Sequence, residues 1–348
     1  MTRALTVSID AMGGDAGPGV VVSALLKTIQ RHSDVRFVLH GDEAQLNKLV
    51  ARHAALKARC AVRHAQDRVS MEDKPSHVLR RGRDTSMWHA IDCVKVGDAD
   101  VAVSAGNTGA LMAVSMFGLG IIEGISRPAI ATIWPTLKGQ TVVLDVGANV
   151  SATEEQLVDF AVMGEAFAHV LLGLARPTVG ILNVGSEEQK GNDGVKGAAQ
   201  ILRNSNLPMA FHGFVEGDDI AKGTVDVVVT DGFTGNIALK TAEGTARLVG
   251  AYLRQSLKRS LMSRLGALAA SGALNTLRRR LDPRAQNGGI FLGLNGVVVK
   301  SHGSADAVGF ASAIDTAIDM ARADINARIT ADRSRITAES LGARTGEL

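Results

Sequence analysis

Short apolar runs, each followed by a polar, glycine-rich loop and then by a helical pattern, recur along the whole chain. The clearest case is Val101–Gly109, VAVSAGNTG, in which a buried strand leads into a turn and then into an apolar helix from Ala110 to Phe117. Continuous apolar strands that alternate with helices are typical of a mostly parallel sheet covered on both faces. We therefore predict an α/β fold of this kind.

Polar loops follow six of the predicted strands. In a parallel sheet the carboxyl ends of the strands open on one crevice, where ligands bind. Turn formation and helix capping account for any one of these loops, whereas six loops at one edge favour a binding cleft. The six loops are Asp10–Asp15, Ser104–Gly109, Asp145–Asn149, Gly185–Asn192, Asp231–Asn236 and Lys300–Ser304.

The residue types in these loops suit an anion and a carbonyl group. Lys190 and Lys300 can bind phosphate as point charges. The Ser104–Gly109 turn places small side chains and backbone N–H groups at a helix N-terminus, where an anion is favoured. Asparagine amides at Asn149 and Asn236 can bind a carbonyl oxygen, and His302 can donate a proton to a leaving group.

Standard cofactor and catalytic signatures do not occur in the sequence. There is no GxGxxG after a strand, no GxxxxGK[ST], no GxSxG and no HExxH, which argues against ordinary dinucleotide, ATP, serine-hydrolase and zincin activities. There is also no CxxC and no Cys/His cluster with zinc spacing. We therefore expect neither a metal nor another cofactor.

The basic residues are concentrated in one segment. Between Arg254 and Arg284 there are eight Lys or Arg and one acidic residue, although the net charge of the chain is +3. Leucines at helical spacing form two stripes, before and after Ser271-Gly272. Two basic amphipathic helices joined by glycine predict a hairpin at 254–284 that lies on anionic lipid, packs against a second subunit, or does both. The candidate contact residues are Leu261, Leu265, Leu268, Arg278, Arg279 and Arg280.

The absence of interleaved aromatic residues argues against nucleic acid as the partner of this segment.

We expect a single α/β catalytic domain over residues 1–329, which includes the hairpin, and a polar, frayed tail at 330–348. The stretch Ser70–Arg83 is either a mobile active-site segment or a surface loop. No run reaches the roughly 18–20 apolar residues that span a bilayer. The sequence has only two cysteines, Cys60 and Cys93, so a disulfide framework is not expected, and this favours a reducing cytosol.

Five motifs, in this order, resemble those of one enzyme family over about Leu5 to Ile325. The chain is similar to the acyl-acyl carrier protein:phosphate acyltransferases, the PlsX family of bacterial phospholipid synthesis. The chain departs from the family pattern at two positions. Ser186 replaces the first acidic residue of the family's NIGEE loop, and Ser151 stands where the family often has Asp. The motifs are DAMGGD at 10–15, VSAGNTGALMA at 103–113, DVGAN at 145–149, DGFTGN at 231–236 and LGLNGVVVKSHG at 292–303.

The resemblance implies a three-layer α/β/α Rossmann-like fold, similar to isopropylmalate dehydrogenase and phosphotransacetylase. It implies a cytoplasmic homodimer that associates with the membrane surface. The implied reaction converts acyl-acyl carrier protein and inorganic phosphate to acyl phosphate and free carrier protein, and a membrane glycerol-3-phosphate acyltransferase then uses the acyl phosphate.

For this reaction we expect phosphate to attack the thioester directly, without an acyl-enzyme. Phosphate would bind Lys190, Lys300 and the turn residues Ser104, Gly106, Asn107 and Thr108. Asn236 and Asn149 would bind the oxyanion or the pantetheine arm. Asp231 and Asp145 would orient these groups or cap helices, and His302 would protonate the leaving thiolate.

Two other functions stay open at the level of sequence. One is an oxidoreductase of the isopropylmalate-dehydrogenase type, which would need a metal-binding carboxylate cluster and a nicotinamide site. The other is a non-catalytic scaffold at the membrane surface, built on the basic hairpin, which leaves the six polar loops unexplained.

Overall fold

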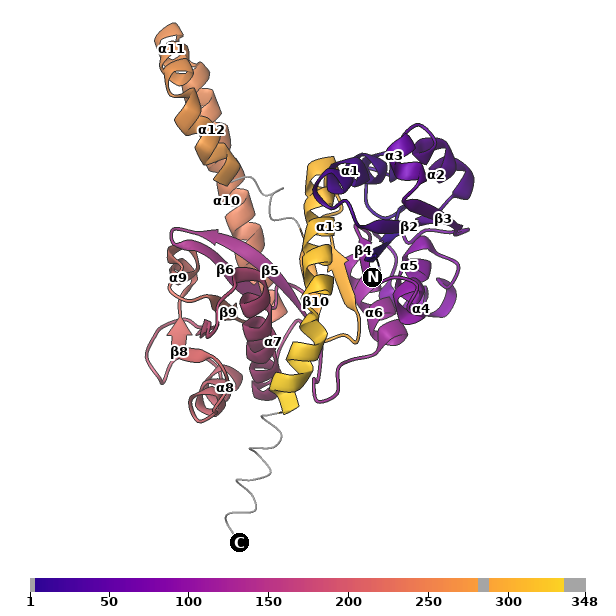
Figure 1. Ribbon diagram of the computed structural model, residues 1–348. Helices are drawn as coiled ribbons and strands as arrows, with labels where there is room; N and C mark the ends of the chain where they lie inside the picture. The colour runs from indigo at the N-terminus through magenta and orange to yellow at the C-terminus, as the bar shows by residue number, and fades with distance from the viewer. Residues whose placement is uncertain (1–3, 281–287, 335–348) are drawn as a thin grey trace.

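The computed structural model describes residues 4–280 and 288–334, which form an eleven-stranded sheet with helices on both faces (Figure 1). The strand order is β3-β2-β1-β4-β11-β10-β5-β6-β9-β7-β8. This confirms the predicted α/β class with a mostly parallel sheet. The strands are β1 (Thr6–Asp10), β2 (Arg36–Gly41), β3 (Cys60–His64), β4 (Val101–Ser104), β5 (Ala129–Thr136), β6 (Gly139–Leu144), β7 (Thr178–Leu182), β8 (Ala210–Val215), β9 (Val227–Val229), β10 (Gly289–Leu292) and β11 (Val297–Lys300).

The sheet contains two parallel groups of strands that run in opposite directions. Strand β10 is antiparallel to both β11 and β5, and β5 is antiparallel to β6. Strands β3, β2, β1, β4 and β11 therefore point one way, and β6, β9, β7 and β8 point the other way. The chain between β5 and β6 is too short for a parallel crossover, which takes a dozen or more residues.

This reversal corrects the expectation that six loops leave one edge of the sheet, which is wrong. The loops at 10–15, 104–109 and 300–304 follow strands of the first group, and those at 145–149, 185–192 and 231–236 follow strands of the second. The two sets of loops therefore leave opposite ends of the sheet.

Helices cover the two faces and create two separate apolar cores. Helices α1, α7, α8 and α13 pack on one face, and α4, α5, α6 and α9 pack on the other. Along β4, Val101 and Val103 enter the first core and Ala102 the second, which explains why the strands read as unbroken apolar runs. The helices are α1 (Pro18–Arg31), α2 (Glu43–Val50), α3 (Ala54–Lys57), α4 (Pro75–Arg81), α5 (Ser86–Lys95), α6 (Thr108–Leu119), α7 (Glu154–Leu172), α8 (Asp193–Arg203), α9 (Gly217–Lys222), α10 (Gly232–Lys258), α11 (Leu261–Ala269), α12 (Ser271–Arg280) and α13 (Ala307–Arg322).

Helices α10, α11 and α12 form an arm that projects from the body (Figure 1). The buried residues of α10 are Gly232 and Gly235, both in its first turn. The predicted leucine contacts at Leu261, Leu265 and Leu268 are 79%, 63% and 72% exposed in the single chain. The side chains of Arg278–Arg280, and residues 281–284 of the predicted hairpin, lie outside what the structure describes.

Two expectations about individual segments need correction. The Ser70–Arg83 stretch contains a helix, α4, which buries Val78 in the second core. The tail predicted from Thr330 is not frayed at its start, since 325–334 is helical. Arg333 of this helix forms an ion pair with Asp159 at 2.9 Å, and Ile329 is fully buried, and both contacts hold the helix on the body. The rest of the predicted tail, 335–348, lies outside the described residues. Within the described ranges, no helix has both the length and the apolar character needed to cross a membrane.

Candidate active site

Four polar side chains form a row across neighbouring strands of the first group. Asp10 at the end of β1 pairs in register with His40 of β2 on one side and Ser104 of β4 on the other. Ser104 in turn pairs with Lys300 of β11. Residues at one register level of adjacent strands point to the same face, so these four side chains share one face at one end of the sheet.

Asp10 holds the turn before α6 in place. Its buried carboxylate accepts hydrogen bonds from Ser86 Oγ and Ser104 Oγ, both at 2.6 Å. Burial raises the pKa of Asp10, and the two hydroxyl hydrogen bonds oppose this rise. Ser104 Oγ also accepts from the Gly106 amide at 3.0 Å. The carboxylate thus fixes the backbone that leads into the helix N-terminus.

Lys300 supplies a positive charge beside this turn. Its ammonium donates to the carbonyl oxygen of Ala105 at 3.3 Å and to that of Ser301. Burial lowers the pKa of Lys300 to about 8, while the carboxylates of Asp10 and Asp15 act in the opposite direction. The side chain is therefore mostly charged at neutral pH and loses this charge in mildly alkaline solution.

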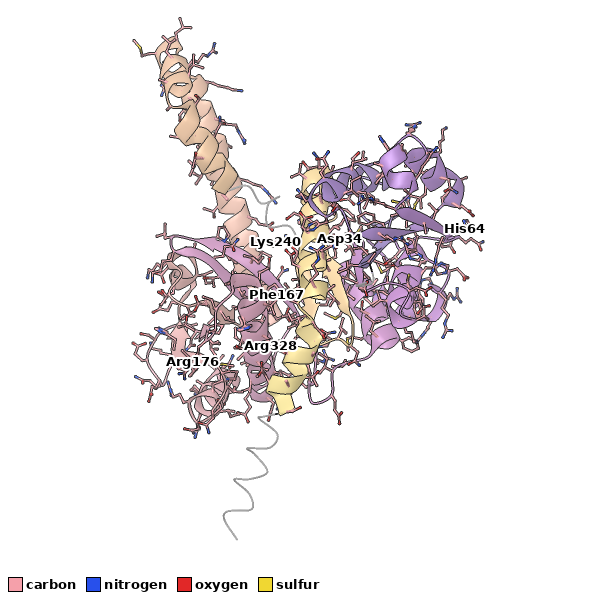
Figure 2. All side chains as sticks on the ribbon, in the orientation of Figure 1. Asp34, His64, Phe167, Arg176, Lys240 and Arg328 are labelled. Atoms are coloured by element: carbon pink, nitrogen blue, oxygen red, sulfur yellow. The ribbon has the colours of Figure 1, made fainter. Side chains whose placement is uncertain are left out.

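His302 lies two residues beyond Lys300, next to the base of the arm. Its Nδ1 atom is hydrogen-bonded to Ser304 Oγ at 3.0 Å. Burial of part of the ring, and then the charge of Lys240 on α10, lower the pKa of His302. Lys240 lies where the arm leaves the body (Figure 2). The neutral imidazole is favoured at neutral pH, so a smaller fraction of His302 is protonated than of an ordinary histidine.

A second cluster is built around Asp145, after β6. Its carboxylate accepts from the amides of Gly147, Ala148 and Asn149 and from that of Ile130, at 2.7–3.1 Å. Burial raises the pKa of Asp145, and these hydrogen bonds oppose the rise. Asp145 thus shapes the loop that follows it.

The two asparagines of this cluster are also held by the protein. Asn149 Nδ2 donates to Pro128 O at 2.8 Å and to Asp145 Oδ2 at 2.9 Å. Asn236 uses one of its two amide protons on Val146 O at 3.1 Å. The loop at 145–149 is therefore tied to the start of α10.

A pocket of about 180 Å³ connects the two sets of loops. Helix α6 starts after the 104–109 turn at one end of the sheet and runs back along the face of the sheet. It therefore reaches toward the 145–149 loop, which leaves the other end. The turn at 104–109 and the loop at 145–149 meet here, although their strands run in opposite directions. The pocket is lined by Thr108, Gly109, Met112, Ala113, Met116, Arg127, Pro128, Ile130, Gly147, Ala148 and Asn149.

The structure separates the predicted site residues into three places. Ser104, Gly106, Lys300 and His302 share the first cluster, and a second set lies around the 145–149 loop. Asn107 and Asp231 are the N-caps of α6 and α10, and the Asn107 amide also binds Met71 O and Asp73 O. The second set is Asp145, Asn149, Asp231 and Asn236, and Thr108 joins Asn149 in lining the pocket.

Lys190 lies apart from Lys300. It is exposed in the loop after β7, and four strands lie between β7 and β11. Its backbone amide donates to Glu187 O at 3.0 Å, and its carbonyl accepts from Asn183 Nδ2. The prediction that Lys190 binds phosphate stays a prediction.

Sequence reasoning missed three residues of the site. Asp10 belongs to a loop that the sequence did single out, but its role in holding two hydroxyl groups depends on distant partners. Ser86 reads as an ordinary first residue of a helix. In the sequence, Arg127 before Pro128 indicates only the end of a regular element. In the structure, its guanidinium donates to Asn149 Oδ1 at 3.4 Å, and the residue lines the pocket. Across residues 4–280 and 288–334, no three His, Cys, Asp or Glu side chains form a group that could hold a metal ion.

Comparison with known proteins finds full-length relatives. The family described as "Fatty acid synthesis protein" matches residues 5–328. A phosphate acyltransferase from Parvibaculum lavamentivorans is 57% identical over 338 residues, which are 97% of this chain and 94% of the relative.

Solved structures share the fold at low identity. A phosphotransacetylase from Streptococcus pyogenes has a TM-score of 0.63 at 16% identity and covers 92% of this chain and 95% of its own. A 4-hydroxythreonine-4-phosphate dehydrogenase from Klebsiella pneumoniae has a TM-score of 0.54 at 13% identity and covers 91% and 99%. The transferase and the dehydrogenase differ in chemistry, so this likeness concerns the fold alone.

Proposed function

This chain belongs to the family of fatty acid synthesis proteins that includes the phosphate acyltransferases, and we propose that its acyl donor is a fatty acyl thioester of an acyl carrier protein. The chain is thus an acyltransferase of lipid synthesis. The proposed products are acyl phosphate and free carrier protein. The observation that carries this proposal is the charged Lys300 beside the α6 N-terminus, next to a pocket with apolar walls.

Phosphate is proposed to bind between Lys300 and the turn at 104–108. The N–H groups in the first turn of α6 have no acceptor within the helix, and they point outward along the helix axis. The helix dipole and the ammonium both favour a dianion at this place. The Ser104 hydroxyl donates to Asp10, and the Gly106 amide donates to Ser104 Oγ. The anion would therefore be held by Lys300 and by the N–H groups at the start of α6 rather than by these two groups.

The chemical step needs no nucleophile from the protein. An oxygen of hydrogen phosphate attacks the thioester carbon, the C–S bond breaks, and the phosphate proton ends on the departing sulfur as a thiol. The site contributes by holding the two reactants together and by stabilising the oxyanion that forms. We propose that the second amide proton of Asn236 supplies this stabilisation, with Asp145 and Asp231 fixing the loops around it. Asn149 is not assigned this role, because its side-chain amide donates to Pro128 O and Asp145.

His302 is proposed to assist the leaving group through a hydrogen bond. A neutral imidazole still has one N–H donor, and its lowered pKa matches that form. A thiolate leaves readily, so the loss of His302 should slow the reaction far less than the loss of Lys300.

The partners are proposed from the surface. The carrier protein docks electrostatically on basic residues near the arm, and the apolar face of α11 contacts a second copy of this chain, an anionic membrane, or both. The protein is proposed to be a cytoplasmic homodimer at the membrane surface, where a glycerol-3-phosphate acyltransferase takes up the product.

The test is phosphate-dependent release of free thiol from acyl-acyl carrier protein, with hydroxylamine trapping of the acyl product. Thiol release that needs phosphate and gives acyl hydroxamate supports the proposal, whereas release without phosphate indicates a thioesterase and contradicts it. Lys300→Ala should raise the KM for phosphate at least tenfold, because the anion loses its cation. Lys190→Ala, measured in parallel, shows whether the exposed lysine also contributes to phosphate binding.

A further inference from the structure

The pocket along α6 has a shape and lining that suit hydrocarbon. Thr108, Met112 and Met116 recur every four residues, as do Gly109 and Ala113, so one stripe of α6 forms a wall. From Thr108 to Met116 this wall is about 12 Å long at 1.5 Å per residue. Pro128 and Ile130 at β5, together with the small residues Gly147 and Ala148, form the opposite side.

We propose that this pocket binds the part of the acyl chain next to the thioester, about six or seven carbons long. The inference rests on the proposed function and adds a binding site to it. The thioester would lie at the Thr108 end, close to the turn that holds Lys300, and the chain would run toward Met116. Methionine is unbranched and polarizable, which suits it to pack against a flexible chain.

The volume sets the length of the bound segment. An engineered apolar cavity of about 150 Å³ holds one benzene molecule. The present pocket, at about 180 Å³, therefore holds little more than six or seven carbons. A longer acyl chain would leave the pocket past Met116.

The polar groups of the lining favour the acyl chain over the pantetheine arm. The arm contains amides that need hydrogen-bond partners when buried. In the pocket, the Asn149 amide is bound to Pro128 O and Asp145, and Arg127 is bound to Asn149 Oδ1. Pro128 has no N–H to offer. The methionine, proline and isoleucine walls are therefore better matched to a group that needs no hydrogen bonds, whereas Thr108 and Arg127 add polar atoms to the lining.

The test measures binding and requires no turnover. Carrier protein is loaded through a non-hydrolysable thioether with chains of 2 to 16 carbons, and its Kd is measured by calorimetry. For the wild-type protein, affinity should rise roughly fourfold per methylene, as expected for burial of a CH₂ group, and should level off near six or seven carbons.

Ala113→Phe fills the pocket, and should abolish this rise while leaving the Kd of the two-carbon analogue unchanged. Met112→Ala enlarges the half-buried wall with little risk to folding, and should move the plateau to longer chains by about three carbons. Phe117→Ala is the matched control, because Phe117 is 61% exposed on the same helix and does not line the pocket; it should bind like the wild type.

Three results would overturn the inference: no length dependence in the wild type, an equal loss for all lengths in Ala113→Phe, or the same effect in Phe117→Ala. An equal loss would assign the pocket to the pantetheine arm. Thiol release is measured on the same proteins. Length-dependent binding without phosphate-dependent release would uphold the pocket and refute the proposed reaction, so the two failures are distinguishable.

Discussion

At the residue scale, the pKa of Lys300 is lowered by its burial at the end of β11. On a fully exposed site its ammonium would stay charged far above neutral pH. At the end of β11 burial lowers its pKa to about 8, and the neighbouring Asp10 and Asp15 keep that fall from being larger. The residue that is proposed to hold phosphate therefore titrates within an accessible pH range.

The KM for phosphate should rise roughly tenfold between pH 7 and pH 9 in the wild type, because the charged fraction of a group with a pKa of about 8 falls to about one tenth at pH 9. Lys300→Arg keeps its charge over this range and should lose most of the rise. Steady-state kinetics at several pH values measure this. Since the titration of phosphate itself is common to both proteins, an identical rise in Lys300→Arg would contradict the role of Lys300.

Glu165 is a buried carboxyl far from the proposed site. It lies on α7 and accepts a hydrogen bond from Arg328 at 3.0 Å, yet burial raises its pKa to about 7. Between its ordinary pKa and about 7, the folded protein binds more protons here than the unfolded chain does. Stability from this group is thus present at low pH and is lost as the pH rises through about 7.

Glu165→Gln should flatten the decline in the free energy of unfolding between pH 5 and pH 8. Urea denaturation at a series of pH values measures this slope. Glu155→Gln, an exposed change in the first turn of the same helix, is the control and should keep the decline. A slope that Glu165→Gln leaves unchanged would show that Glu165 does not titrate in this range.

At the scale of elements, the site depends on how closely α10 approaches the 145–149 loop. A Cβ atom at Gly235 would lie 1.9 Å from the carbonyl oxygen of Asp145, whereas one at Gly244, further along α10, would meet nothing within 4 Å. The first glycine is needed for packing between the helix and the loop. The second has no such neighbour, although both belong to one helix.

Gly235→Ala should destabilise the protein by about 1–3 kcal/mol, as overpacking does, and should lower activity because the 145–149 loop is displaced. Gly244→Ala should stabilise by roughly 0.5–1 kcal/mol through helix propensity. Denaturation and thiol-release assays on the pair measure both effects. Equal effects of the two substitutions would mean that the close approach at Gly235 is not important.

At the scale of the whole molecule, the arm carries large apolar side chains that the single chain leaves uncovered. Large apolar side chains on α10 and α11 are more than half exposed, among them Tyr252, Leu261 and Met262. Contiguous exposed apolar surface of this kind marks an interaction site. The body buries two apolar cores beneath the helices on the faces of the sheet. It also exposes large apolar side chains, among them Leu137 and Val150.

Replacing Leu261, Leu265 and Leu268 together by Ser should disrupt whatever the arm contacts. If that is a second copy, analytical ultracentrifugation should show a shift to monomer. If it is lipid, the protein should keep its oligomeric state and lose binding to anionic vesicles in flotation. Charge reversal at Arg278–Arg280 should reduce only the salt-sensitive vesicle binding. No change in either assay would contradict both assignments of the arm.

The sequence by itself determined the local structure and the family. Alternation of apolar runs and helical patterns predicted most strands and helices, since burial on both faces of a strand leaves a continuous apolar signal. Motifs such as DAMGGD and DGFTGN marked loops that do form the two clusters. Strands β8 and β10 and the short helices α4 and α9 were not predicted, because short or edge elements carry little periodic signal.

Only the tertiary structure decided which loops meet. Lys300 and Ala105 are 195 positions apart in the chain, and Ser104 and Asp10 are 94 apart, so their contacts follow from strand order. The antiparallel strands β10, β5 and β6 send the other loops, including the loop of Lys190, to the opposite end of the sheet. Local patterns report conformation and burial of each segment, whereas strand direction and order depend on pairing between distant segments.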